Sequence, residues 1–253
     1  MEKSNQVEKF VEVQIKRQEK EGAPIYWETF QIKWRPNLNV IALLQDLQSS
    51  PVTAEGKTTT PPAWEAACLE EVCGTCSMII NGKPRQACSA LVDKLEQPIR
   101  LEPFSKFPIV RDLMTDRSRM FEHLKQVKAW IDIDGTHELG SGPRYSQTLA
   151  LSRYKMSECM TCGCCLEACP QYGPQSPFVG PQAINQLRLF NSHPSGSMNS
   201  EERLDRVMGV GGITDCGDAQ NCVKVCPKNI PLTESIADVS GQTTRYAFKK
   251  LFS

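Results

Sequence analysis

Apolar and polar residues alternate along two segments near the start of the chain. The apolar positions, each separated from the next by a polar residue, are Val11, Val13 and Ile15 in the first segment and Phe30, Ile32 and Trp34 in the second. This period is typical of strands that bury one face. Residues 21–24 read Glu-Gly-Ala-Pro and favour a turn. The pattern therefore predicts two strands joined by a turn.

A helical pattern and a hairpin signal follow these strands. Residues 36–39, Pro-Asn-Leu-Asn, precede apolar side chains at helical spacing in residues 40–47. Further along, Asn81-Gly82 is a strong signal for a two-residue β-hairpin. The order strand, strand, helix and then a cysteine-containing loop resembles the β-grasp layout of plant-type ferredoxins.

Beyond residue 108 the apolar period becomes helical. The positions that predict one face of a long amphipathic segment are Val110, Leu113, Met120, Leu124, Val127 and Ile131. Pro181 is expected to start another helix, because proline suits the first helical position. Asn199 with Glu202 has the spacing of a capping pair for a helix that ends at Gly209.

These patterns divide the chain into two parts. The proline-containing segment 98–108 has the character of a linker. We therefore expect a β-grasp, ferredoxin-like domain in residues 1–106 and a mostly α-helical domain in residues 107–253. The cysteine motifs described below make the first a [2Fe–2S] domain and the second a dicluster ferredoxin-like domain. The predicted fold class is α+β.

The composition narrows the class of partner. The 253 residues include 29 Lys and Arg and 29 Asp and Glu, so no net charge attracts nucleic acid or an acidic membrane. The longest apolar runs are much shorter than a membrane span, and the polar N-terminus has no signal-peptide core. We expect a cytosolic protein, or a peripheral subunit on the cytosolic face of a membrane, with no nucleic-acid partner.

Twelve cysteines in such a chain indicate metal or cluster ligation, because disulfides are typical of secreted proteins. The first group reads Cys68-x4-Cys73-x2-Cys76 and is followed by Cys88, which is the plant-type [2Fe–2S] spacing. Gly74 can bring its amide close to a cluster sulfur. Zinc is the alternative for four thiolates, but zinc sites usually pair two C-x2-C knuckles.

Two ferredoxin-type runs of cysteines lie in the second half. They read Cys159-x2-Cys162-x2-Cys165-x3-Cys169-Pro170 and Cys216-x2-Ala219-x2-Cys222-x3-Cys226-Pro227. With this bacterial spacing, the fourth cysteine of each run ligates the other run's cluster. The resulting sets are Cys159, Cys162, Cys165 and Cys226 for a [4Fe–4S] cluster, and Cys169, Cys216 and Cys222 for a [3Fe–4S] cluster.

The second set has only three members because Ala219 stands where a ligand belongs. A degenerate, empty loop is one alternative there, and a fourth iron completed by water or another residue is the other. The spacing omits Cys164, which we expect to be a small buried residue. A labile thiol or a spare ligand is the alternative for Cys164.

No residue is predicted to be catalytic. The three histidines, His123, His137 and His193, form no constellation and are expected to be surface or packing residues. The sequence contains no evident Ser–His–acid set, phosphate-binding glycine loop or GxGxxG motif. The chain is therefore predicted to carry electrons rather than to catalyse bond chemistry.

The order of these motifs resembles the iron–sulfur subunit of succinate dehydrogenase and fumarate reductase over nearly the whole chain. Further matching stretches are residues 35–39, 68–74, 81–85 and 111–113. They look most like the subunit of Gram-positive bacteria that use menaquinone.

The resemblance implies a role and a set of partners. A flavoprotein with covalent FAD oxidises succinate, and electrons pass through the [2Fe–2S], [4Fe–4S] and [3Fe–4S] clusters to a membrane anchor with b haems and menaquinone. The chain would then be peripheral, on the cytoplasmic face of the membrane. The alternatives are the same subunit working in reverse as a fumarate reductase, a soluble multi-cluster ferredoxin and a non-redox zinc scaffold.

One departure from the family concerns the electron acceptor. Ubiquinone-reducing members have a tryptophan shortly after the Cys-Pro that matches Cys169-Pro170, and a histidine just after the cysteine that matches Cys216. In this chain residues 170–174 read Pro-Gln-Tyr-Gly-Pro, and Gly217 follows Cys216. The departure argues against a ubiquinone-type pocket and favours menaquinone or a haem relay.

Overall fold

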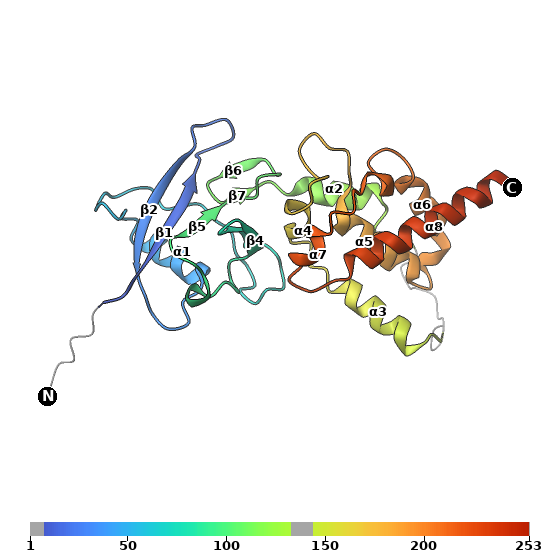
Figure 1. The fold of residues 1–253 in the computed structure, drawn as a ribbon, viewed down its shortest axis with the longest axis horizontal. Helices are drawn as coiled ribbons and strands as arrows, with labels where there is room; N and C mark the ends of the chain where they lie inside the picture. The colour runs from blue at the N-terminus through green and yellow to red at the C-terminus, as the bar shows by residue number, and fades with distance from the viewer. Residues whose placement is uncertain (1–7, 133–143, 253) are drawn as a thin grey trace. The chain divides into compact units, whose positions relative to one another are not determined.

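The computed structural model describes residues 8–132 and 144–252. Residue contacts divide the chain into two compact units, Met1–Asp116 and Arg117–Ser253, coloured from blue to green and from green to red in Figure 1. The expected domain boundary after residue 106 stays a prediction.

The first unit is built on a five-stranded sheet with the strand order β2-β1-β5-β3-β4. These strands are β1 Phe10–Arg17, β2 Tyr26–Lys33, β3 Ser77–Ile80, β4 Lys83–Gln86 and β5 Ile99–Glu102. Strand β1 pairs antiparallel with β2 and parallel with β5. A parallel pair requires a crossover, and the connection from β1 to β5 includes helix α1, Val40–Ser49. The mixed sheet with this helix confirms the predicted fold class for the first half.

The alternating pattern places the apolar side chains of β1 in the core of this unit. The fully buried residues of β1 and α1 include Val11, Val13, Ile15, Leu43, Leu44 and Leu47. Each such side chain contributes about 1.5–3 kcal/mol through burial. Asn39 accepts a hydrogen bond from the Ala42 amide at 2.8 Å and caps α1. The two predicted strands and the predicted helix are confirmed.

The hairpin signal is also confirmed. Asn81 and Gly82 have φ angles of 49° and 75° and connect β3 to β4, with Ile80 paired to Lys83. Positive φ at both central residues is the type I′ geometry that Asn-Gly favours. The hairpin leads to Cys88, and a 3₁₀ turn at Val92–Lys94 follows.

The prediction of one long helical segment from residue 110 to residue 131 is wrong. A short hairpin of β6, Ile109–Arg111, and β7, Met114–Thr115, occupies its first part, and helix α2 covers only Ser118–Gln126. Asp112 at the turn has a left-handed φ of 47°, and Leu113 packs into the core of the first unit. The helical spacing of apolar residues in this segment therefore comes from a short hairpin followed by a short helix, and not from one long helix.

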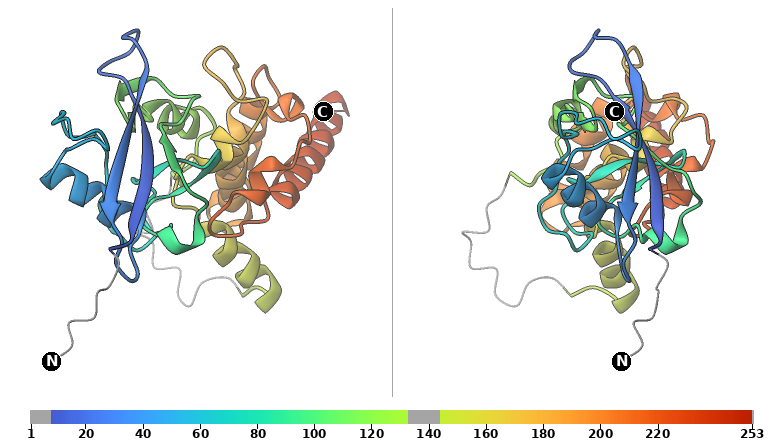
Figure 2. Two further views of the ribbon diagram at one scale, coloured as in Figure 1. Left: turned by 60° about the vertical axis from the view of Figure 1, so that its left-hand side comes forward. Right: turned by 90° about the vertical axis from the view of Figure 1, so that its left-hand side faces the viewer.

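The second unit is mostly helical, as predicted (Figure 2). Beyond α2 its helices are α3 Gln147–Ser157, α4 Cys164–Glu167, α5 Gly180–Ser192, α6 Ser200–Val207, α7 Asn221–Lys224 and α8 Leu232–Phe252, with 3₁₀ turns at Gly196–Asn199 and Ile213–Asp215. Pro181 lies in the first turn of α5, as expected. Helix α5 packs on α8, where Arg188 Nε donates to Asp238 Oδ2 at 2.9 Å. None of the described helices is long and apolar enough to cross a membrane.

The predicted capping pair at α6 does not form. Asn199 occupies the N-cap position, but its side chain makes no capping hydrogen bond and donates instead to Asp132 Oδ2 at 3.0 Å. Glu202 pairs with Lys128 and Arg206. Asp132 and Lys128, which lie in a distant segment, therefore engage the side chains of Asn199 and Glu202, and Arg206 of the same helix also pairs with Glu202.

Candidate functional site: three groups of cysteines

The first group of cysteines lies in a tight loop immediately before β3. Cys68 Sγ accepts hydrogen bonds from the amides of Glu70, Val72 and Cys73 at 3.3–3.4 Å. Cys73 Sγ accepts from the amides of Cys68 at 3.5 Å and Thr75 at 3.4 Å. Amide donors directed at sulfur stabilise thiolates, which are the form that binds iron.

Left-handed residues give this loop its curvature. Leu69, Glu71 and Gly74 have φ angles of 61°, 55° and 71°. Glycine adopts such angles freely, but a leucine or glutamate at positive φ is uncommon and typical of functional sites. Sequence reasoning identified Gly74 and missed Leu69 and Glu71, because nothing in their residue types indicates a left-handed backbone.

Environment changes the acidity of two thiols in this group. Burial opposes ionisation of Cys73, but hydrogen bonds from Thr75 and Cys68 outweigh it and lower the pKa of Cys73 to about 6. Burial, with the neighbouring Cys76 and Cys68, raises the pKa of Cys88 to about 11. The Ala87 amide donates to the Cys76 carbonyl oxygen at 3.1 Å, so the hairpin returns Cys88 to the loop.

A second group lines one cavity in the helical unit. Cys159, Cys162, Cys165 and Cys226 lie on its wall. The first three come from the first ferredoxin-type run, and Cys226 comes from the other. Burial, followed by repulsion from neighbouring thiols, raises the pKa of Cys165 well above its usual range.

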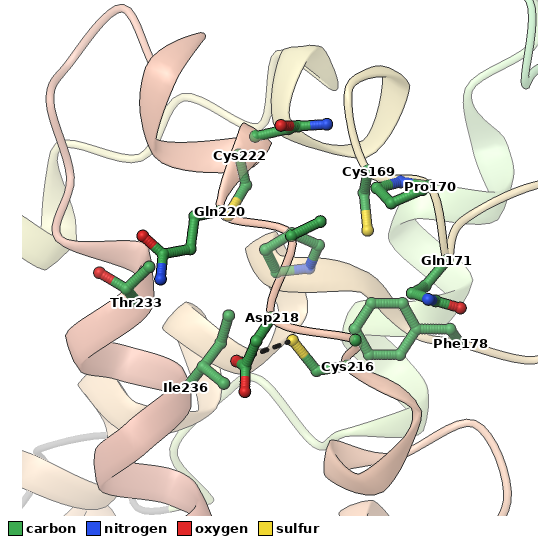
Figure 3. Close-up of a pocket in the computed structure, with 14 residues that line it drawn as sticks. Cys169, Pro170, Gln171, Phe178, Cys216, Asp218, Gln220, Cys222, Thr233 and Ile236 are labelled. Carbon is green, nitrogen blue, oxygen red and sulfur yellow. Dashed lines mark hydrogen bonds between the residues drawn. The ribbon is translucent and has the colours of Figure 1, made fainter.

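A third group lines a separate cavity in the same unit (Figure 3). Cys169, Cys216 and Cys222 lie on its wall together with Ala219. Burial and the two other thiols raise the pKa of Cys222 to about 11. Cys216 Sγ lies 3.9 Å from Asp218 Oδ1 and donates to it. Each cavity therefore contains the last cysteine of the opposite run.

Other candidate residues lie away from these cavities. Cys164 is fully buried, as expected, and lines neither cavity. His123 is buried in α2 and packs edge-on against Tyr172, with ring centroids 5.7 Å apart. His193 follows α5, and His137 lies outside the described residues.

The donor sets fit iron–sulfur clusters. Each group presents thiol sulfurs, the ligand type that these clusters require. Apolar side chains also line the cavities, with Ile230 and Leu232 in the second and Phe178 and Ile236 in the third. Among the described residues, no three or more His, Cys, Asp or Glu are grouped so as to hold a single metal ion.

Comparison with known proteins places the chain in a family. The family model "2Fe-2S iron-sulfur cluster binding domain" matches residues 12–122, and "4Fe-4S dicluster domain" matches residues 155–230. The chain is 56% identical over 238 residues to the succinate dehydrogenase iron–sulfur subunit of Bacillus subtilis, covering 94% of each chain. It is 33% identical over 244 residues to the fumarate reductase iron–sulfur subunit of Mycobacterium tuberculosis, covering 95% of each.

A solved structure shares the fold. The match is to a chain of the Mycobacterium smegmatis Sdh1 complex in the apo form, with a TM-score of 0.79 and 21% identity. It covers 96% of this chain and 98% of that one. The sequence identities to the Bacillus subtilis and Mycobacterium tuberculosis subunits confirm the predicted resemblance: the chain belongs to the family of iron–sulfur subunits of succinate dehydrogenase and fumarate reductase.

Proposed function

We propose that this chain is the electron-transfer subunit of a membrane-bound succinate:quinone oxidoreductase. The observation that carries the proposal is the exchange of cysteines between the two ferredoxin-type runs. Cys226 lines the cavity of the first run, and Cys169 lines the cavity of the second. Two clusters whose ligands are exchanged in this way lie close together, which suits transfer of electrons from one to the next.

The proposed ligands divide into three sets. They are Cys68, Cys73, Cys76 and Cys88 for [2Fe–2S], Cys159, Cys162, Cys165 and Cys226 for [4Fe–4S], and Cys169, Cys216 and Cys222 for [3Fe–4S]. When bound, these clusters supply one-electron oxidation and reduction. No residue of this chain is assigned a catalytic role, so succinate oxidation belongs to a flavoprotein partner with FAD.

The protein contributes charge stabilisation and exclusion of water. Backbone amides of the 68–76 loop direct positive partial charge at two sulfurs, which favours a more negative bound group. In the second cavity Cys165 is buried, which disfavours added charge because water cannot solvate it. The surroundings of the sites therefore differ, and the surroundings of each site adjust the reduction potential of the cluster bound there.

Exposed residues at the first and third sites support the proposal that partner subunits bind there. Leu69 and Val72 in the first loop are 51% and 57% exposed, and apolar side chains beside a redox site suit a protein partner. At the third site, residues 217–220 are all exposed, which suits an acceptor. We assign the flavoprotein to the first site, and the cytochrome b anchor with menaquinone to the third. The chain would then be peripheral on the cytoplasmic face of the membrane.

The reverse direction, fumarate reduction, is the second candidate. The similarity to the fumarate reductase subunit of Mycobacterium tuberculosis favours it. The same cysteine sets serve both directions, and the cluster potentials relative to the quinone decide between them.

The exchange of cysteines gives a direct test. In the purified complex, we expect Cys226→Ser to remove or alter the four-iron electron paramagnetic resonance (EPR) signal and Cys169→Ser to remove or alter the three-iron signal. Cys164→Ser is the matched control and should leave all three signals unchanged. The opposite assignment of Cys226 and Cys169 would contradict the ligand sets. Zinc in place of iron and sulfide, or purification without a flavoprotein, would contradict the function.

A further inference from the structure

Gln171 lies over Gly217 at the rim of the third cavity. A β carbon at position 217 would lie 2.4 Å from Nε2 of Gln171, closer than real contacts allow, and 3.2 Å from its Cδ, which is a tight contact. Both residues line the cavity with Cys169 and Cys216. The absence of a side chain at 217 therefore provides the space that the Gln171 amide occupies.

The loop that carries Gln171 is held firmly in place. Arg119 donates to the carbonyl oxygens of Gly173, at 2.5 Å, and Ser176, and its guanidinium lies 5.0 Å from the ring centroid of Tyr172. Ser176 Oγ donates to the Gln171 carbonyl oxygen at 2.6 Å. These contacts fix the backbone of Gln171 and so restrict the positions that its side chain can reach.

The side-chain amide of Gln171 has no protein partner among the described residues, since the one hydrogen bond of this residue involves its backbone carbonyl. It adjoins the Cys216–Gly217 segment, whose cysteine supplies a sulfur to the cavity. N–H donors to cluster or ligand sulfur stabilise the more negative, reduced form and raise its potential.

We propose that the Gln171 amide donates a hydrogen bond to the sulfur of the group bound by Cys169, Cys216 and Cys222, and thereby raises its reduction potential. Gly217 is required because a side chain there would displace the amide. The inference rests on the proposed function, which assigns a three-iron cluster to these cysteines. Gln171 is a positioning residue that acts on electron affinity and not on substrate.

Two substitutions reach the same amide independently, which makes the inference testable. Gln171→Ala removes the donor. Gly217→Ala displaces it at little cost to folding, since the group that must move is the end of a flexible side chain. In an EPR-monitored redox titration of the purified complex, each substitution should lower the equilibrium constant for reduction of the three-iron centre by up to about tenfold. This corresponds to a reduction potential lower by about 59 mV. The double variant should show no further shift.

Gln175→Ala is the matched control, because Gln175 lies in the same loop but does not line the cavity. It should leave the three-iron potential unchanged, and the other two clusters should keep their potentials in every variant. A three-iron signal that does not move in Gln171→Ala, or that moves equally in Gln175→Ala, would overturn this inference alone. A complex without a three-iron signal before any substitution would overturn the proposed cluster and the inference together.

Discussion

Replacing Asp112 by alanine should strongly destabilise the first unit. Asp112 is 2% exposed and Arg17 is 1% exposed. One carboxylate oxygen accepts from Arg17 Nε at 3.0 Å and from the Gln18 amide at 3.1 Å. The other accepts from the Ala63 amide at 2.9 Å. The substitution leaves two backbone amides and a buried guanidinium without this acceptor.

The magnitude follows from these contacts. Breaking a buried ion pair costs about 3–5 kcal/mol, and the lower end applies because Arg17 keeps its bridge to Glu28. A loss of about 3 kcal/mol lowers Tm by at least about 12 °C in a unit of this size. Ala63 lies shortly before Cys68 in the chain, so we expect the [2Fe–2S] cluster to be lost in the same transition.

The assay is thermal unfolding of the cluster-loaded chain, followed by circular dichroism in the far ultraviolet and in the visible cluster bands. Lys33→Ala is the matched control in the same unit. Lys33 pairs with Glu8 at the surface, with side chains 66% and 58% exposed, and such pairs contribute about 0–1 kcal/mol. A Tm for Asp112→Ala no lower than that for Lys33→Ala would refute the reasoning.

Three further predictions concern the helical unit. Asp218→Asn should raise the reduction potential of the proposed three-iron cluster by about 40 mV in a redox titration, because a carboxylate 3.9 Å from Cys216 Sγ opposes added negative charge by about 1 kcal/mol in water. An unchanged potential would contradict this. Cys164→Ala should retain every cluster signal and lower the free energy of unfolding by about 1 kcal/mol; loss of a signal would make Cys164 a ligand. Burial, followed by the charge of Arg119, lowers the pKa of His123 below 6.5. The unfolded state therefore binds the proton more readily, and the free energy of unfolding falls as the pH drops below about 6.5. Denaturant unfolding of His123→Phe should show less of this decline, and a pH dependence identical to that of the unsubstituted chain would exclude His123 as its source.

Local sequence patterns predicted the strands and turns whose formation depends on residues adjacent in the sequence. The alternation in residues 11–15 matches β1, and Asn81-Gly82 matches a type I′ turn, because strand period and turn chemistry are properties of adjacent residues. The apolar spacing from residue 110 failed for the same reason. A periodicity count cannot separate a short hairpin followed by a short helix from one long helix.

The capping pair at α6 failed because of partners far along the chain. Asn199 and Glu202 have the right types and spacing, but Asp132 and Lys128 offer them charged partners. Charge-assisted contacts are stronger than neutral capping bonds. No pattern within α6 contains that information.

The sequence by itself determined which cysteines the chain offers as ligands and how far apart they lie along the chain, because spacing is covalent. It therefore predicted the family and three sets of cysteines. Only the tertiary structure decided what lies around the cysteine groups: the left-handed residues at Leu69 and Glu71, the carboxylate of Asp218 near Cys216 and the amide of Gln171 beside Gly217. The backbone angles and the approach of Gln171 to Gly217 form only in the folded chain, and charges and hydrogen bonds around a cluster are what adjust its reduction potential.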